Sequence, residues 1–551
     1  MNRTVTYYVG DGFVVNSDGD VRSMAPYAGF LADPKDGRVK CFYWLDWDVA
    51  KLIRMIGEQW VADDLKSENQ AQLGDWLVMK YIPGRFYSQK SPSGAFAVFS
   101  DCHQYTDARP EENVGIERAI DLAKMANVTA DQVVGAFEAI GIKPTNIISP
   151  INVYEKNVLD DMGFPTDDDI PEEAIGEMAY LCDKAGWTET FALGFFPAVN
   201  VYDIKSAYPT EIRDLVNIRL GEWYATTQVN HDADLGYYRG TLTTWAKFHP
   251  FIYKLEYKGE NRSYTPVGSW ETCLTLKEIK FLEKWGLGTF ELAPPGWDFD
   301  NEEPIPSGWE FRADRNVDPY DAFPFYEIVT GLIEAKEAAP NDAARGAYKR
   351  IPNGLGGKFV QGFEGELGKF FNSVYSAEMT TNTRLKVAEL CLENEIIPIA
   401  VVIDSVMTTE DLVIDESGAP GSWRLANTGS AIVAGTGVVA IEGKQGHGDF
   451  SLTYSWLKGE IDQDPQANRY SMERLTPFNL KLWSGKSEDF PKLGSLRVMS
   501  RAVEINYDYK RAYRKTPKNG ADLMSGVYAS SPWGVDLIRI GGVAPDLDPV
   551  F

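Results

Sequence analysis

Histidine and paired cysteine are scarce in this sequence of 551 residues. The four histidines are too dispersed to suggest a zinc site. No C-x-x-C pair occurs among the five cysteines, which are Cys41, Cys102, Cys182, Cys273 and Cys391. An odd number of scattered cysteines without a secretory signal favours reduced, mostly buried thiols in a cytoplasm. A zinc domain and a disulfide framework are therefore not expected.

Long apolar runs are also missing. No stretch of about 18 apolar residues could form a transmembrane helix. The start, MNRTVTYYVGDG, lacks the apolar core of a signal peptide. We therefore expect a cytoplasmic protein with no membrane partner.

Positive charge is outnumbered, since 54 Lys and Arg face 80 Asp and Glu and leave a net charge of −26. A negative net charge argues against a protein that coats nucleic acid along its length, although a local basic channel could still bind nucleic acid. The acidic balance and the 15 tryptophans would also suit a carbohydrate-active enzyme. Both classes stay open on composition alone.

The length predicts about two to four domains, and we place a boundary near residue 190. Before it, ERAIDLAKMANVTADQVVGAFEAIG predicts two short helices. After it, residues 195–320 look rich in strands, with YYRGTLTTW and FHPFIYKLEYKG as hairpin material.

Further along, residues 322–351 look helical, with a break at APND. Residues 375–394 predict an amphipathic helix, and residues 395–414 predict two strands around a polar turn.

Two aspartates share one context although they lie 201 positions apart. Asp203 follows the apolar strand AVNVY, and Asp404 follows the apolar strand IPIAVVI. Strand-end aspartates often only begin a turn. If two strands of one sheet brought these tips together, however, the carboxylates would repel each other unless cations lay between them. Such a pair meets the requirement of a two-metal site for Mg²⁺ and substrate phosphates.

A basic segment adds to this pair. In ARGAYKRIPNGLGGKF, Arg345, Lys349 and Asn353 are spaced four apart and would share one helix face. Two cations and an amide on one face suit a triphosphate tail, although a solvated helix face gives the same pattern. Pro352 should kink or end that helix.

These stretches resemble the motifs of family B DNA polymerases. YDIKSAYPT is similar to motif A, D-x-x-S-x-Y-P-S. KRIPNGLGGKF resembles motif B, K-x-x-x-N-S-x-Y-G, through Lys349, Asn353 and Gly357. VVIDSVMT resembles motif C, D-T-D-S, through Asp404 and Ser405. The motif order agrees, and the likeness is greatest to the short viral and protein-primed branch, which implies a host cytoplasm if the protein is viral.

The resemblance implies a DNA polymerase that uses two Mg²⁺ ions, with Mn²⁺ as an alternative. Asp203 and Asp404 would hold the ions, with the Ile204 carbonyl as a further ligand. Tyr208 would lie under the sugar and exclude a 2′-hydroxyl. The implied nucleotide-binding residues are Tyr208, Arg345, Lys349 and Asn353.

Four positions depart from the family pattern. Val402 replaces the first Asp of motif C, and Gly356 replaces the Tyr of motif B. Thr436 and Val438 replace the Lys and Tyr of the family's Lys-x-Tyr motif. In the family the second Asp of motif C is the firmer metal ligand, so the resemblance still implies activity.

Residues 1–190 resemble the ribonuclease-H-like proofreading domain of the same family more weakly. Asp11, Asp48 and Asp183 would be its remaining carboxylates, and Phe13 stands where the first motif needs Glu. Because such a two-metal set needs all its carboxylates, we expect a degenerate exonuclease.

A basic segment with interleaved tyrosines lies near the C-terminal end of the sequence. We predict that it contacts the phosphate backbone of DNA, through Lys510, Arg511, Arg514, Lys515 and Lys518. The expected partners are primer-template DNA and dNTPs, and a priming protein or other replication proteins are further candidates.

We therefore expect an α+β fold in which a polymerase right hand follows a ribonuclease-H-like, exonuclease-type domain. The expected divisions are an exonuclease-like domain over 1–190 and a polymerase domain over 191–551, with the palm at 191–320 and 361–450, the fingers at 321–360 and the thumb at 451–551.

Two other functions stay open at this point. Val402 and Gly356 would suit a catalytically degenerate, polymerase-like protein that only binds nucleic acid. A glycoside hydrolase would need two carboxylates that flank a sugar cleft, and it leaves the spacing from Lys349 to Asn353 unexplained.

Overall fold

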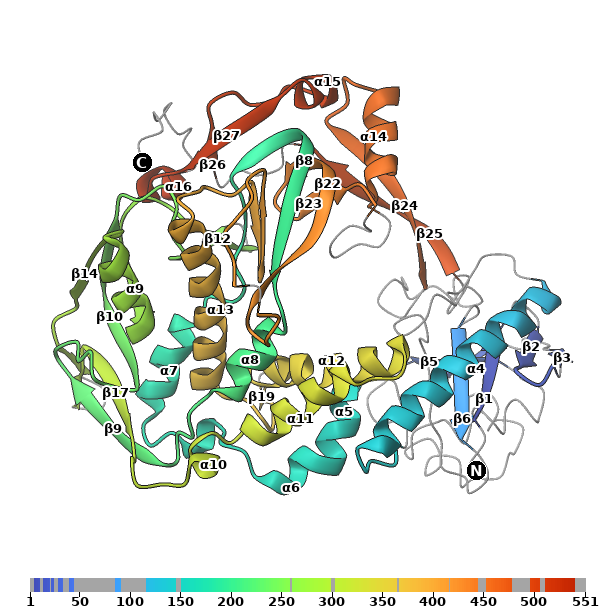
Figure 1. The fold of residues 1–551 in the computed structure, drawn as a ribbon, viewed down its shortest axis with the longest axis horizontal. Coiled ribbons are helices and arrows are strands. Elements are labelled where there is room, and N and C mark those ends of the chain that lie inside the picture. Colours follow the sequence, from blue (N-terminus) through green and yellow to red (C-terminus); the bar gives the residue numbers. More distant parts are fainter. Residues whose placement is uncertain are drawn as a thin grey trace. The chain divides into compact units, whose positions relative to one another are not determined.

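The computed structural model of the protein describes residues 4–9, 13–19, 21–23, 28–32, 39–43, 85–90, 115–144, 150–257, 260–298, 303–363, 366–415, 417–443, 452–477, 496–505 and 511–540. The chain forms two compact units that both mix helices and strands (Figure 1). Unit 1 comprises residues 1–163, 334–351 and 473–501, and unit 2 comprises residues 164–333, 352–472 and 502–551. In the described part of the chain, no helix is both long enough and apolar enough to span a bilayer.

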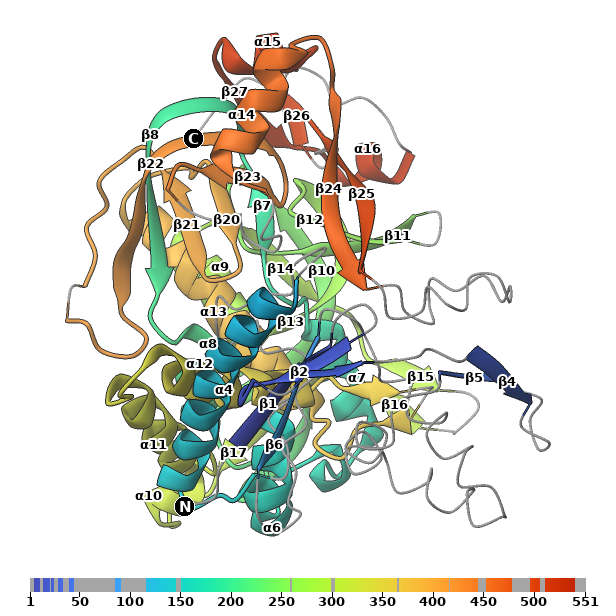
Figure 2. The ribbon, with the colours of Figure 1, turned by 90° about the vertical axis from the view of Figure 1, so that its right-hand side faces the viewer.

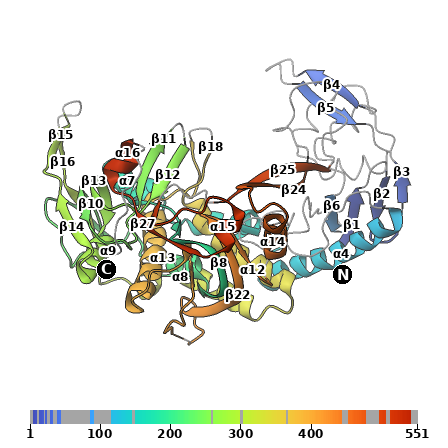
Figure 3. The same cartoon turned by 90° about the horizontal axis from the view of Figure 1, so that it is seen from above.

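Unit 1 contains a four-stranded sheet in the order β3-β2-β1-β6. Helix α4 contacts β1, β2 and β6, and runs along this sheet (Figures 2 and 3). The bounds are β1 Thr4–Val9, β2 Phe13–Asn16, β3 Val21–Ser23, β6 Arg85–Lys90 and α4 Ile116–Ala139. A separate pair joins β4 Ala28–Ala32 to β5 Val39–Tyr43, and the short helices α5 Pro150–Tyr154 and α6 Asp160–Met162 follow α4.

Helix α4 corrects the prediction of two short helices. It runs unbroken for 24 residues. The Thr129 hydroxyl donates to the Met125 carbonyl one turn back, at 3.2 Å, so this polar residue is accommodated inside the helix. The buried alanines and Phe137 continue on one face from end to end.

The stretch that contains Asp11 and Phe13 lies within a hairpin of two strands. Strands β1 and β2 pair antiparallel, with Val9 opposite Val14, so Phe13 begins a second strand. Asp11 and Asp48 lie outside the described residues, and their predicted exonuclease roles stay predictions.

Unit 2 is built on an eight-stranded sheet whose main path is β23-β22-β8-β21-β20-β7. Strand β27 pairs with the first part of β8, and β26 pairs with β27. The bounds are β7 Thr188–Thr190, β8 Ala192–Ile204, β20 Ala400–Val402, β21 Ser405–Thr408, β22 Trp423–Gly435, β23 Val438–Ile441, β26 Arg511–Tyr513 and β27 Val527–Pro532. Strands β20 and β21 confirm the two strands predicted within 395–414.

A second, five-stranded sheet follows the order β13-β10-β17-β9, with β14 on β10. The bounds are β9 Gly221–Thr226, β10 Leu235–Thr244, β13 Gly268–Thr275, β14 Gly288–Leu292 and β17 Gly308–Ala313. The two stretches predicted as hairpin material do form strands, but β10 pairs within this sheet while β11 Tyr253–Tyr257 pairs with β12 Glu260–Tyr264.

The remaining elements are short hairpins and helices. The hairpins are β15 Gly296–Asp298 with β16 Glu303–Ile305, and β18 Gly362–Phe363 with β19 Glu366–Leu367. The helices are α10 Pro319–Ala322, α14 Tyr454–Gln463, α15 Gly520–Met524 and α16 Val535–Ile540. Four elements cross from one unit's residue ranges to the other's, namely α11 Tyr326–Glu337, α12 Asp342–Lys358, β24 Arg469–Pro477 and β25 Leu496–Glu504. The gap between α11 and α12 confirms the break predicted at APND.

Helix α13 Ser373–Glu393 is the central helix of unit 2 and contacts α7 Glu173–Cys182, α8 Ala207–Arg213 and α9 Leu276–Trp285 (Figure 1). The predicted helix is confirmed, but its predicted amphipathic character is wrong. Sixteen of its residues are buried, among them Glu378 and Arg384. Because α13 is enclosed on nearly all sides, its polar side chains need partners inside the unit.

Three ion pairs join α13 to α9, and two of them contrast in burial. Arg384 donates to Glu278 at 2.8 Å, and these side chains are 0% and 1% exposed. Lys284 donates to Glu389 at 2.6 Å, and these side chains are 56% and 35% exposed. Glu278 also accepts from the Thr275 backbone amide, which caps the start of α9.

These two pairs give a matched stability test. We expect Arg384→Met to lower the free energy of unfolding of unit 2 by about 3–5 kcal/mol, because it leaves the buried Glu278 carboxylate without its counter-charge. Lys284→Met should cost less than about 1 kcal/mol. Chemical denaturation of both variants measures the difference, and equal losses would contradict the assigned burial.

Candidate active site

Strands β8 and β21 bring Asp203 and Asp404 together. The two strands pair antiparallel with Ser405 opposite Asp203, so Asp404 directly precedes the residue that faces Asp203 across the ladder. The backbone amide of Ile204 donates to the Asp404 carbonyl at 3.1 Å. This confirms the prediction that two strands of one sheet bring these carboxylate-bearing residues side by side.

Each aspartate is followed or preceded by a residue in the left-handed backbone region. Ser206 has φ 56° and is the N-cap residue directly before α8, and Ile403 has φ 58° in the two-residue turn between β20 and β21. Such a conformation costs about 1–3 kcal/mol for a residue with a side chain, and a β-branched residue such as Ile403 adopts it least readily. The Ile403 amide donates to the Trp187 carbonyl at 2.7 Å, which helps to hold the turn that carries Asp404.

Tyr208 lies close to the aspartates. Its position in the first turn of α8 leaves it half-buried. Burial raises the pKa of Tyr208 to about 12, and the negative charges of Asp404 and Asp183 add to the rise. A side chain at Gly186 would lie 3.3 Å from the Tyr208 hydroxyl and 3.2 Å from Ile403 Cγ1. Gly186 therefore lets Tyr208 and the turn at Ile403 approach each other closely. Because its pKa is raised, the Tyr208 phenol stays protonated at neutral pH.

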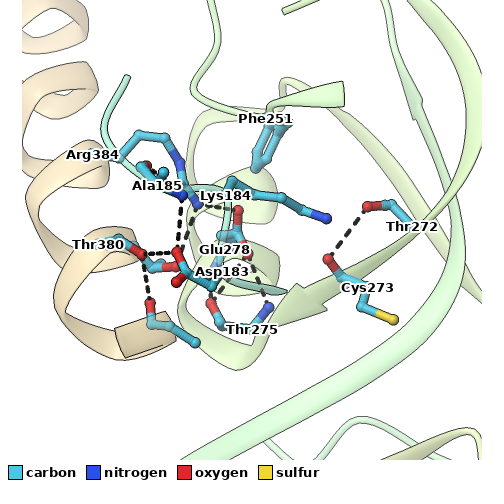
Figure 4. A network of polar contacts seen from close by, with 12 residues as sticks. Asp183, Lys184, Ala185, Phe251, Thr272, Cys273, Thr275, Glu278, Thr380 and Arg384 are labelled. Atoms are coloured by element: carbon cyan, nitrogen blue, oxygen red, sulfur yellow. Dashed lines mark hydrogen bonds and ion pairs between the residues drawn. The ribbon is translucent and has the colours of Figure 1, made fainter. Parts of the chain in front are cut away.

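Asp183 belongs to a buried polar network that supports this turn (Figure 4). Its carboxylate accepts from the Ser376 hydroxyl at 2.6 Å, the Thr380 hydroxyl at 3.0 Å and the Ala185 amide at 2.9 Å. Arg384 also donates to the Ala185 carbonyl, at 3.4 Å. Asp183 is thus occupied within unit 2, and it is better described as a structural residue there than as an exonuclease ligand.

Arg424 is a site residue that sequence reasoning missed. It stands opposite Asp203 in the β8–β22 ladder, and its Nη2 lies 2.8 Å from Asp203 Oδ2. No motif signals it, because its position follows from the register of two strands that are distant in sequence.

The donor set fits a hard divalent cation. Carboxylate oxygens of Asp203 and Asp404 and the nearby Ile204 carbonyl are the oxygen ligands that Mg²⁺ prefers. Within the described ranges, no group of three or more His, Cys, Asp or Glu residues could hold a metal by itself. Mg²⁺ is commonly held by one or two carboxylates together with substrate phosphates, so the predicted magnesium site stays a prediction.

Helix α12 confirms the predicted shared face. Arg345, Lys349 and Asn353 are exposed and recur at every fourth position. The helix continues through Pro352, so the predicted break there is wrong. Arg345 and Lys349 fall in unit 1 and the aspartates in unit 2, so their predicted contact with one nucleotide stays a prediction.

Gly356 lies where α12 approaches α13. A Cβ at this position would lie 2.8 Å from Met379 Sδ and 3.5 Å from Ile212 Cδ1. A larger side chain would require Met379 to move, so glycine permits the close approach of the two helices at this point.

The basic segment near the C-terminal end is divided by burial. Arg511 pairs with Glu189 at 2.8 Å, the two side chains being 0% and 2% exposed, and its guanidinium lies 4.0 Å from the Phe191 ring centroid. This corrects the prediction that Arg511 contacts DNA, because it is enclosed in unit 2. The remaining residues stay predicted DNA contacts, with Arg514, Lys515 and Lys518 exposed and Lys510 outside the described residues.

Comparison with known proteins gives only a distant likeness. No family model and no curated protein matches the chain. Among solved structures, Phi29 DNA polymerase in complex with primer-template DNA aligns with 13% identity and a TM-score of 0.46 over 72% of this chain and 74% of that one. An orthorhombic crystal form of Phi29 DNA polymerase aligns with 14% identity and a TM-score of 0.46 over 87% of this chain and 83% of that one. A TM-score below 0.5 does not establish a shared fold, so the site residues have to support any functional proposal.

Proposed function

We propose that the protein is a template-directed DNA polymerase that adds deoxynucleotides to a primer 3′ end by two-metal phosphoryl transfer. One observation carries the proposal. Asp203 and Asp404 lie 201 positions apart, yet β8 and β21 place them side by side at the end of one sheet. The residues around them resemble polymerase motifs A and C, and they occur in the family's order.

In this proposal the aspartates act as ligands. Asp203, Asp404 and the Ile204 carbonyl hold two Mg²⁺ ions, or Mn²⁺ in their place. Two bound ions would supply activation of the primer 3′-oxygen and stabilisation of the negative charge that develops at the α-phosphorus. The protein orients the carboxylates through the β8–β21 ladder, before substrate arrives.

Other residues of the chain bind and select the nucleotide. Lys349 and Arg345 contact the triphosphate, and Asn353 lies on the same helix face. Tyr208 lies against the sugar, and its ring leaves no room for a 2′-hydroxyl. The base is selected by pairing with the template, and Arg514, Lys515 and Lys518 bind the DNA backbone.

A second candidate is a polymerase-like protein that binds nucleic acid without catalysis. The ion pair between Arg424 and Asp203 favours it, because a protein cation already neutralises one of the two carboxylates. Primer extension separates the two candidates. None of the described residues favours the glycoside hydrolase alternative.

The aspartates provide the main test. We expect Asp203→Asn and Asp404→Asn each to slow primer extension in Mg²⁺ about 1,000-fold or more, because each removes a metal ligand. Circular dichroism should show both variants folded. Near wild-type extension by either variant would disprove the metal-site assignment.

Sugar selection tests the role of Tyr208. Tyr208→Ala should raise the use of ribonucleotides relative to deoxynucleotides about 10- to 100-fold, because it opens the space under the sugar. Tyr208→Phe keeps the ring and should leave the selectivity unchanged. The measurement is single-nucleotide extension with dNTP and rNTP, and unchanged selectivity in Tyr208→Ala would place the steric gate elsewhere.

We also propose that the chain does not proofread, because Phe13 stands where a metal-binding Glu is needed. A 3′-mismatched primer in Mg²⁺ without dNTPs should stay intact over the time in which a matched primer is fully extended with dNTPs. Rapid removal of the mismatched nucleotide, lost in Asp48→Ala, would show an active exonuclease.

A further inference from the structure

Asp203 lies on a central strand with a different partner on each side. On one side, β21 presents Ser405, next to the second carboxylate of the pair, Asp404. On the other side, β22 presents Arg424, whose Nη2 lies 2.8 Å from Asp203 Oδ2. The same sheet therefore carries Asp404, a second negative charge near Asp203, and Arg424, a positive charge that pairs with Asp203.

The two side chains of this ion pair differ in their exposure to solvent. The Asp203 side chain is 20% exposed, whereas the Arg424 side chain is 59% exposed. The backbone of Arg424 is fixed in the β-ladder, so its guanidinium always stays within reach of Asp203. Because the guanidinium is solvated and its stem is flexible, the attraction is modest and the pair can open.

A divalent cation needs the oxygen that Arg424 contacts. Each Asp203 oxygen that accepts from the guanidinium is less available as a metal ligand, and a second positive charge nearby repels an incoming cation. Once a metal neutralises the carboxylates, the attraction that holds the guanidinium at Asp203 weakens. The cation and Arg424 are therefore competitors for one carboxylate.

We propose that Arg424 is the resident counter-ion of Asp203, which a divalent cation has to displace, so that Arg424 sets the metal concentration at which the site fills. This rests on the proposed function, in that it takes Asp203 as a metal ligand. Arg424 is a positioning residue in this scheme, and its effect is on metal affinity before any reaction takes place.

The test measures cation binding by the full chain without DNA. Isothermal titration with MnCl₂ and with MgCl₂, at constant low ionic strength, gives the dissociation constant for wild type and three variants. Arg424→Gln keeps hydrogen-bond donors but removes the charge, and Arg424→Lys keeps the charge. Arg315→Gln is the matched control, because Arg315 is another exposed arginine of unit 2 that pairs with an aspartate, Asp234, at 2.7 Å.

We expect Arg424→Gln to tighten cation binding about two- to fivefold, which is the range that an exposed ion pair allows. Arg424→Lys should stay within about twofold of wild type, and Arg315→Gln should match wild type, which excludes an effect of net charge alone. The Mg²⁺ concentration for half-maximal primer extension should fall by the same factor in Arg424→Gln.

Two outcomes would overturn the proposal. Unchanged or weaker cation binding in Arg424→Gln would show that Arg424 does not compete, while Mg²⁺-dependent extension would leave the polymerase function standing. If Asp203→Asn bound the cation as wild type does, the metal would not lie at Asp203, and both the proposed function and the role of Arg424 would fall.

Discussion

The buried carboxylate of Asp183 is the contact on which the candidate active site depends most. It links the interior of α13, through Ser376 and Thr380, to a short segment that continues to Trp187. The Trp187 carbonyl then accepts the amide of Ile403, in the turn that carries Asp404. Because α13 is enclosed by other elements, each step of this chain is held by packing as well as by hydrogen bonds. The left-handed conformation of Ile403 persists because its surroundings leave it little alternative.

Ion pairs in unit 2 occur both in the buried interior and at the surface. In the interior, Glu278 meets Arg384 and Glu189 meets Arg511, and each pair is almost fully enclosed. Such pairs add little net stability, but they cannot be broken without leaving a buried charge. At the surface, Asp203 meets Arg424 in a pair that is open to solvent. The buried pairs are thus permanent parts of the folded unit, whereas the solvent-exposed pair of Asp203 and Arg424 can open.

The sequence predicts what depends on local pattern. Apolar runs that end in Asp203 and Asp404 indicate buried strands, and these runs are enough to place both residues at strand ends. The break between α11 and α12 follows from Pro340 and Asn341, which favour a turn and a helix start. A continuous α4 was harder to predict, because Asn127 and Thr129 disfavour a helix interior by propensity, and packing on the sheet of unit 1 outweighs it.

What could not be predicted depends on contacts between distant positions. The neighbouring Arg514 and Lys515 suggest that Arg511 is a surface cation. It is instead buried, and it pairs with Glu189, which is 322 positions away. Arg424 and Asp203 are 221 positions apart and pair because of the register of β8 and β22, which no local sequence pattern indicates. The enclosure of α13 likewise depends on three other helices, so its polar residues indicated an exposed face that the helix does not have.

The hairpin that carries Asp404 is held through the backbone at Val402. Val402 pairs with Ser405 on one side and with Thr188 on the other, and both pairings use the backbone. The hairpin that positions Asp404 therefore forms whatever side chain stands at 402. The position of Asp404 therefore depends on the backbone pairings of this hairpin with β7 and β8, and not on the side chain at 402.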